Sequence, residues 1–332
     1  MHTFAIPLML AALLAMGVHS TFFGPIKYAI LPQHLHADEV LAGTGLVEAG
    51  TYIAILAGTI LAGWIPVEWA AGMVIVTAMI GYLTSRFVPP APSQMEAQPL
   101  DLNVIRSSIT LVRMTTRHPR VALAIAAISV FWTVGAVLFI QFPPLVKNVL
   151  DASKEVASLF LVVFSIGVAI GSVSINHLLK GKVSARYGPP AVIVMGLFII
   201  AFHFVCRAWM PHAGEALMGV PAFVTQPLAV PLLLTLLGIA ISGGMFVVPL
   251  YAFLTTVVDK SETARTIAAN NILNSGAMVV GSVLAVSLSA AGVPIINQLL
   301  LGSVLCLVTA WIAWRLCVAE RAHEGEIEHT FD

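Results

Sequence analysis

Charge is what this sequence has least of. Only 10% of its 332 residues are Asp, Glu, Lys or Arg, whereas 59% are hydrophobic. Soluble domains carry about 25% charged residues, so most of this surface must face something other than water. The composition therefore excludes an ordinary water-soluble protein. The formal net charge is zero, which leaves no excess charge of either sign, and we predict no nucleic-acid partner.

Cysteine and metal-ligand patterns are equally scarce. The three cysteines, Cys206, Cys306 and Cys317, lie singly in apolar stretches and form neither a disulfide framework nor a metal-binding spacing. The densest histidine cluster, "HLHADE" (34–39), lies at the boundary of an apolar run, which favours a solvated loop over a metal site. We therefore predict no metal and no cofactor.

Apolar runs of roughly 20 residues recur along the chain, and each is long enough to cross a bilayer as a helix. Breaks at Pro, Gly and charged residues divide them into about nine helices. Their expected bounds are 4–22, 38–65, 67–88, 121–142, 155–178, 189–210, 228–257, 265–291 and 294–318. We therefore predict an all-α, polytopic membrane protein.

Basic residues set the orientation of these predicted spans. When alternate loops are assigned to one side, that side holds thirteen of the 16 Lys and Arg residues. The other side holds only Lys147, Lys154 and Arg207. Because cytoplasmic loops carry the excess of Lys and Arg, we predict that the first side is cytoplasmic. The C-terminus would then lie inside and Met1 outside.

The longest break, residues 89–120, opens with "PPAPSQMEAQP", which has the composition of a linker. The following segment places apolar residues on one helical stripe and arginines on another. The apolar stripe is Leu102, Ile105, Ile109 and Val112, and the basic stripe is Arg106, Arg113, Arg117 and Arg120. This pattern favours an amphipathic helix in the cytoplasmic membrane interface; an ordinary connector is the alternative.

This break also gives the expected domain plan. Residues 1–88 form a partial N-terminal bundle of three spans, and residues 89–120 form the cytoplasmic linker with its amphipathic helix. Residues 121–318 form a six-helix C-terminal bundle, followed by a polar cytoplasmic tail at 319–332.

Five sequence segments indicate which protein family the chain resembles. They are "FFGPIKYAILPQHL", "GTGLVEAGTYIAILAGTILAG", "FWTVGAVLFIQFPP", "FVVPLYAFL" and "ARTIAANNILNSGAMVV". In order and spacing the chain resembles the bacterial lysophospholipid transporter family of the major facilitator superfamily, nearest its acyltransferase-fused members. That superfamily joins two six-helix halves by a long cytoplasmic connector. The resemblance implies that the first three helices are lacking here, and we expect a misassigned upstream start rather than a nine-helix carrier.

The resemblance implies a function as well. It implies movement of lysophospholipids, mainly lysophosphatidylethanolamine and lysophosphatidylglycerol, from the outer to the inner leaflet of a bacterial inner membrane by alternating access. Membrane lipids and a cytoplasmic acyltransferase are the implied partners. No His is followed five residues later by Asp, so we do not expect an enzyme. The alternatives are a facilitator for another amphiphile or drug, and an inactive fragment or acyltransferase docking partner.

Lys27 is the first candidate substrate-binding residue, near the cytoplasmic end of the first predicted span and after a Gly24-Pro25 break. A compact ammonium suits a phosphate ester, and Tyr28 could add a hydroxyl. The alternative is a lysine that reaches the interface as a simple anchor. The resemblance favours the binding role, because Lys27 lies within one of the five segments.

Glu48 is the second candidate. It lies ten residues after Asp38, hence roughly 15 Å along the helix and near mid-membrane. A carboxylate at that depth normally faces a cavity or a partner. We predict that Glu48 lines a cavity, where it pairs with Lys27 as a gate or receives an ammonium head group. A protonated acid in a packed helix interface is the alternative.

Amides in the second half complete the predicted binding site. The asparagines are Asn270, Asn271 and Asn274 of "AANNILNSG". Because amides are costly toward lipid, we expect either head-group contacts or polar helix–helix contacts. Gln141 is expected either to line the pore or to cap its span. Trp132 and Tyr251 are expected to pack rather than bind.

A conformational-switch element is expected in the second half. "GVAIG" and "HLLKGKVSARYG" resemble the superfamily's cytoplasmic loop motif. Gly167 and Gly171 would permit close helix approach, and Lys180, Lys182 and Arg186 would meet helix ends and lipid head groups. A plain basic cytoplasmic loop is the alternative.

Overall fold

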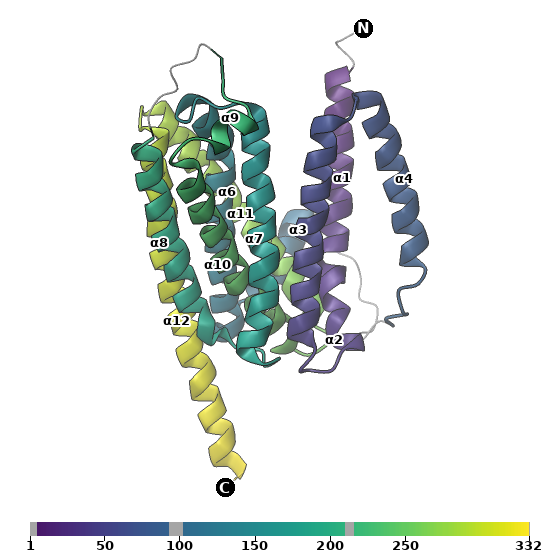
Figure 1. The fold of residues 1–332 in the computed structure, drawn as a ribbon. Helices are drawn as coiled ribbons and strands as arrows, with labels where there is room; N and C mark the ends of the chain where they lie inside the picture. The colour runs from purple at the N-terminus through teal and green to yellow at the C-terminus, as the bar shows by residue number, and fades with distance from the viewer. Residues whose placement is uncertain (1–4, 93–101, 210–215, 332) are drawn as a thin grey trace.

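The computed structural model describes residues 5–92, 102–209 and 216–331, and these ranges are almost entirely helical (Figure 1). Their one β contact is an isolated bridge between Ala152 and Met218. The helices are α1 Ala5–Ala29, α2 Leu31–His34, α3 Val40–Trp64, α4 Val67–Ser85, α5 Val104–Thr115, α6 Pro119–Asn148, α7 Lys154–Leu179, the short η1 Ala185–Tyr187, α8 Gly188–Arg207, α9 Val220–Val224, α10 Ala229–Thr256, α11 Thr263–Ala290 and α12 Ile295–Phe331.

Most of these helices can span a membrane. Among the described residues, eight are long and apolar enough to cross a bilayer, and the apolar part of α4, Trp69–Ser85, is a shorter ninth. The predicted all-α, polytopic membrane fold is therefore confirmed. Each of the nine expected runs corresponds to one of these helices.

Several predicted helix ends are wrong, and prolines explain two of them. The expected break at Gly24-Pro25 does not occur, because α1 continues through Pro25 to Ala29. Likewise α6 continues through Pro143 and Pro144 to Asn148. A proline removes one backbone hydrogen bond, but membrane helices tolerate this because neighbouring groups satisfy the freed carbonyl. The last helix also extends beyond residue 318, so the expected polar tail continues α12.

Two groups of helices lie side by side (Figure 1). In the first group, hereafter the six-helix unit, α7 and α8 pack on α10, α6 and α8 pack on α12, and α6 packs on α11. The second group, hereafter the three-helix unit, consists of α1, α3 and α4. The units meet where α3 contacts α7 and where α1 contacts α11. One end of the molecule carries α2 and the other carries α9, and we call these the α2 end and the α9 end.

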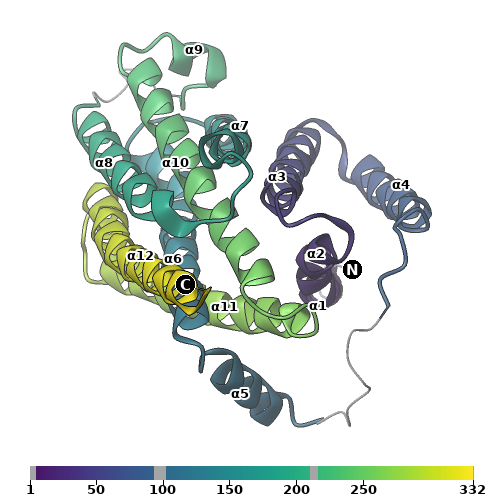
Figure 2. The same cartoon turned by 90° about the horizontal axis from the view of Figure 1, so that it is seen from below.

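The amphipathic segment forms α5, which lies at the α2 end beside α11 (Figure 2). Asn103 caps it by accepting a hydrogen bond from the Arg106 amide. Its apolar stripe is not covered by the protein, since Leu102 is 88% exposed and Ile105 is 73% exposed. That exposure favours the interfacial helix over the ordinary connector, and its immersion in lipid stays a prediction.

Candidate functional site

Among the described residues, the three-helix unit contacts the six-helix unit mainly near the α2 end. In α1, the described side chains from Ile6 to Phe23 are exposed, and burial begins further on, at Tyr28 and Ala29. In α3 the pattern is reversed, since the buried side chains lie between Val40 and Tyr52 and those described beyond are largely exposed. The units therefore close on each other at the α2 end and separate toward the α9 end (Figure 1).

Glycine permits this closure. A Cβ atom on Gly45 of α3 would lie 2.9 Å from the backbone oxygen of Ser172 in α7, closer than real Cβ contacts. Nearer the α2 end, Gly181 adopts a left-handed φ of +77°, and a Cβ there would lie 2.9 Å from the backbone oxygen of Asp38. Backbone thus contacts backbone where the two units meet at the α2 end, and we call this contact the junction. Only small residues allow such a close approach.

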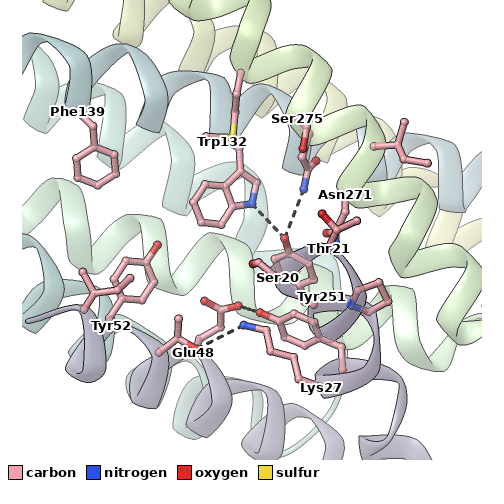
Figure 3. Close-up of a pocket in the computed structure, with 18 of the residues that line it drawn as sticks. Ser20, Thr21, Lys27, Glu48, Tyr52, Trp132, Phe139, Tyr251, Asn271 and Ser275 are labelled. Atoms are coloured by element: carbon pink, nitrogen blue, oxygen red, sulfur yellow. Dashed lines mark hydrogen bonds between the residues drawn. The ribbon is translucent and has the colours of Figure 1, made fainter. Parts of the chain in front are cut away.

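A cavity of about 880 Å³ lies between the units, directly beyond this closed junction. Helices α1 and α3 line one side of it, and α6, α7, α10 and α11 line the other. Its volume falls within the range of about 300–1,000 Å³ typical of small-molecule sites. Figure 3 shows side chains from both units pointing into it.

Two stacked tyrosines connect the units at the floor of this cavity. The rings of Tyr28 in α1 and Tyr251 in α10 have centroids 4.8 Å apart and lie 6° from parallel. The Tyr28 hydroxyl donates a hydrogen bond to the Glu48 carboxylate. The Tyr251 hydroxyl accepts from Trp132 Nε1 at 3.1 Å and from Asn274 Nδ2 at 3.4 Å (Figure 3). Both rings are buried, so the stack seals the floor.

The two charged residues of the cavity lie beside this stack. Glu48 is only 3% exposed, and a carboxylate in that setting is costly without a partner. The Tyr28 hydroxyl supplies that partner. The Lys27 ammonium donates to Thr51 Oγ1 at 3.4 Å and lies 4.8 Å from the centroid of the Tyr28 ring, within the range of a cation–π contact. Neutral groups thus contact both charged residues, which also interact electrostatically with each other, and both residues line the cavity.

The fold and the cavity agree with comparisons to known proteins. The family model of the Major Facilitator Superfamily matches residues 1–282. This chain belongs to the major facilitator superfamily. The crystal structure of the E. coli fucose:proton symporter FucP has the same fold, with a TM-score of 0.59 and 13% identity over 91% of this chain and 74% of that chain. At this identity the likeness shows the fold alone.

Curated relatives include lysophospholipid transporters named LplT. The chain is 27% identical to that of Citrobacter koseri over 271 residues, which is 80% of this chain and 62% of the relative. It is 26% identical to that of Shigella boydii over 273 residues, with the same coverage of both chains. The chain therefore spans 62% of the length of these curated relatives.

The cavity of this superfamily member brings together most of the predicted binding residues. Five of them line it, and these are Lys27, Tyr28, Glu48, Asn271 and Asn274. Asn274 also accepts a hydrogen bond from Ser129 at 2.8 Å, so it joins α11 to α6 as well as facing the cavity. Their roles in binding stay a prediction.

The other two predicted binding residues lie elsewhere. Gln141 does not line the cavity; it is buried and donates a hydrogen bond to Gln298, which joins α6 to α12. Asn270 is fully buried behind the lining, beside Tyr251. These two side chains are thus turned toward helix interfaces, which agrees with the alternative of polar helix–helix contacts for the asparagines, and a substrate contact of either residue stays a prediction.

Sequence reasoning overlooked several lining residues. Trp132 and Tyr251, expected only to pack, face the cavity and hydrogen-bond to each other. Tyr52 lines the cavity one helical turn after Glu48, a spacing that could have revealed it. The rings of Phe139 and Phe164 gave no comparable signal, because apolar residues occur on every face of these spans.

The hydroxyl of Tyr251 is expected to stabilise the floor of the cavity. In Tyr251→Phe, the Trp132 indole and the Asn274 amide lose an acceptor in a buried site, which costs about 1–3 kcal/mol. Thermal unfolding in detergent should show a lower melting temperature than for the wild type. Tyr82→Phe, in an exposed position of α4, is the control and should leave it unchanged. Equal melting temperatures for wild type and Tyr251→Phe would contradict this hydrogen-bond network.

The predicted switch element lies at the α2 end. Lys180 ends α7 in a left-handed conformation, with φ of +51°, and Lys182 is exposed. Arg186 donates from Nη2 to the Leu178 carbonyl at 3.3 Å, and its guanidinium carbon lies 4.8 Å from the centroid of the Tyr187 ring. The segment is thus tied to the end of α7 and touches the loop before α3. A switching role stays a prediction.

Gly167 and Gly171 bring α7 close to α10. A Cβ on Gly167 would lie 2.5 Å from the Ala240 Cβ, and one on Gly171 would lie 2.1 Å from the Ile241 carbonyl oxygen. Gly171→Ala should therefore force the helices apart and cost about 1–3 kcal/mol of stability. The melting temperature in detergent measures this, with Gly17→Ala, which meets no atom within 4 Å, as the control. If both variants unfold at the same temperature, the close packing is not what stabilises this pair.

Proposed function

We propose that this protein is a transporter that moves lysophospholipids from the outer to the inner leaflet of a bacterial inner membrane. The observation that carries the proposal is the composition of one cavity between two helical units. Its floor holds the ammonium of Lys27 and the carboxylate of Glu48, whereas much of its wall is apolar. Such a cavity suits a ligand with a charged head and one acyl chain, and the similarity to LplT proteins supports the same ligand class.

The expected transport cycle follows from the closure at one end. The thirteen-to-three division of basic residues supports a cytoplasmic position for the α2 end, and with it the C-terminus. The state described here is then closed inward and open outward. Separation of the units at the α2 end, with closure at the α9 end, would deliver the head group to the inner leaflet. The acyl chain can stay in an apolar environment throughout.

The head group has partners of both charges in this cavity. An ammonium point charge such as Lys27 attracts a phosphate ester, and Glu48 can receive the amine of lysophosphatidylethanolamine. Lysophosphatidylglycerol would use Lys27 and the hydroxyls and amides instead. A cytoplasmic acyltransferase remains the proposed partner that restores the missing chain.

Uptake by spheroplasts tests this function. Cells that express the chain should take up labelled lysophosphatidylethanolamine several times faster than vector controls, and the product should become accessible to a cytoplasmic acyltransferase. Diacyl phosphatidylethanolamine should not compete, because its second chain needs a further apolar groove. Equal uptake with and without the protein would reject the proposal. Competition by apolar cationic drugs but not by lysophospholipids would favour a facilitator of drugs instead.

A further inference from the structure

The two flanks of the cavity differ in chemistry. Toward α3, α6 and α7 the lining is aromatic and aliphatic, and we call this side the aromatic flank. It consists of Tyr52, Ile55, Phe139, Leu161 and Phe164. Thr51 and Ser165 of the same helices also line the cavity, but their hydroxyls already donate to the backbone carbonyls of Val47 and Leu161. Toward α1 and α11 the lining is rich in hydroxyls and amides, and we call this side the polar flank. Its polar members are Ser20, Thr21, Asn271 and Ser275, beside the apolar Ile272 and Met278.

The close-up shows this division directly. Phe139 and Tyr52 lie at one side of the cavity, and Thr21, Asn271 and Ser275 lie at the other (Figure 3). Glu48, Lys27 and the Tyr251 ring lie between them, at the floor. An amphiphile that places its charged group on the floor therefore meets an apolar wall on one side and a hydrogen-bonding wall on the other.

We propose that the aromatic flank is the acyl-chain subsite of the transporter, and that the head group lies on the floor against the polar flank. This inference rests on the proposed function and deepens it. An acyl chain offers no hydrogen bonds, so placing it against Ser20, Asn271 and Ser275 would leave their polar groups unpaired. If the chain lies along the aromatic flank, it contacts apolar side chains, and the polar flank stays available for hydrogen bonds with the head group.

The rings of the aromatic flank form a rigid wall. Phe139 and Phe164 contact edge to face, with centroids 4.9 Å apart and planes at 71°. Phe164 also lies 6.4 Å from Tyr52, which joins the wall to α3 of the other unit. Behind Phe139, Phe142 packs edge to face at 5.7 Å and is itself buried. These contacts hold the rings in place before a ligand arrives, which suits recognition of an apolar chain.

The flank also has an outlet for a long chain. Beyond Tyr52, the next cavity-lining residue on α3 is Ile55, which is exposed, and the neighbouring Ile53 and Ala54 are exposed too. In Figure 1 the axes of α3 and α7 diverge in this direction, toward the α9 end. Because Ile55 both lines the cavity and is exposed, we infer that the far end of a chain that lies along Phe164 and Leu161 reaches the lipid past this residue. A lauroyl chain should therefore end within the subsite, whereas a longer chain should contact the subsite along its whole length and be preferred.

Filling the subsite tests the proposal. Leu161→Trp places a bulky ring in the path of the chain, so uptake of stearoyl and palmitoyl lysophosphatidylethanolamine should fall about tenfold or more, as expected when an apolar pocket no longer fits its ligand. The lauroyl compound, whose chain is shorter, should lose much less. Ser275→Leu on the polar flank is the matched control. Its effect on uptake, relative to the wild type, should be the same for all chain lengths.

A second variant protects the test against misfolding. Phe164→Ala enlarges the subsite, so it should weaken discrimination between lauroyl and stearoyl compounds while the protein still reaches the membrane. A length-dependent change in either variant supports the subsite. If the wild type transports lysophospholipids but Leu161→Trp and Phe164→Ala change uptake of all chain lengths equally, the subsite proposal is overturned. If the wild type moves none of them, the proposed function itself fails.

Discussion

Glu48→Gln should reduce uptake of lysophosphatidylethanolamine about tenfold or more and leave uptake of lysophosphatidylglycerol much less affected. Glutamine keeps the size of the side chain and can still accept the hydrogen bond from Tyr28, but it carries no charge. A hydrogen bond to a charged group contributes about 1.5–3 kcal/mol, which corresponds to roughly 10- to 150-fold in rate. Only the ethanolamine head has an ammonium group that can use this carboxylate.

Lys27→Ala should reduce the uptake of both lipids, because both contain the phosphate that the ammonium is expected to bind. Comparison of the two variants separates the roles of Glu48. If Glu48 were only a gate that pairs with Lys27, its substitution would affect both lipids equally. Glu155→Gln, exposed at the start of α7, is a charge-matched control that should behave as wild type. Unchanged uptake in both Lys27→Ala and Glu48→Gln would remove these residues from the site.

Gly45→Leu should trap the protein with its units apart at the α2 end. No side chain fits between Gly45 and the Ser172 backbone, since even a Cβ atom would lie 2.9 Å from the Ser172 carbonyl oxygen. Interfaces between membrane helices that depend on such contacts do not accept large residues. The protein should therefore be unable to adopt the closed state described here. Uptake should fall about tenfold or more, because alternating access needs both states.

The rate at which a thiol reagent modifies a cysteine at Tyr28 reports the state of the junction. This buried position at the floor should react faster in the Gly45→Leu background if the α2 end opens. The matched control is Gly50→Leu on the same helix, because Gly50 meets no atom within 4 Å. Equal thiol reactivity in the two backgrounds would show that Gly45 does not hold the junction closed.

Composition and hydropathy were sufficient to predict the helices, because each span must satisfy its backbone hydrogen bonds internally and present apolar residues to lipid. Glu48 could be singled out for the same reason, since a charge at that depth needs a protein partner. The identity of that partner could not be predicted. The sequence suggested either Lys27 or the ammonium of a head group. In the structure the Tyr28 hydroxyl donates to Glu48, while Lys27 donates to Thr51 and also interacts electrostatically with Glu48.

One reason explains why the sequence did not reveal some cavity-lining residues and suggested the wrong surroundings for others. Lipid-facing, packed and cavity-facing residues are all apolar in these spans, so Phe139 and Phe164 could not be distinguished from packing residues. A polar residue such as Gln141 stands out in the sequence, but a hydrogen bond to Gln298 across a helix interface satisfies it equally well. The rotation of each helix within the bundle decides between these environments, and it depends on contacts between distant segments.

A reversible cross-link across the α2 end tests the central claim, that the units must separate there for a lysophospholipid to cross. Asp38 and Lys182 are exposed on opposite sides of the junction, near the contact of Asp38 with Gly181. In a variant whose native cysteines are replaced with alanine, Asp38→Cys and Lys182→Cys would be joined by a cleavable thiol reagent. The account predicts that cross-linking abolishes lysophosphatidylethanolamine uptake and that cleavage of the linker restores it. Undiminished uptake by the fully cross-linked protein would contradict it.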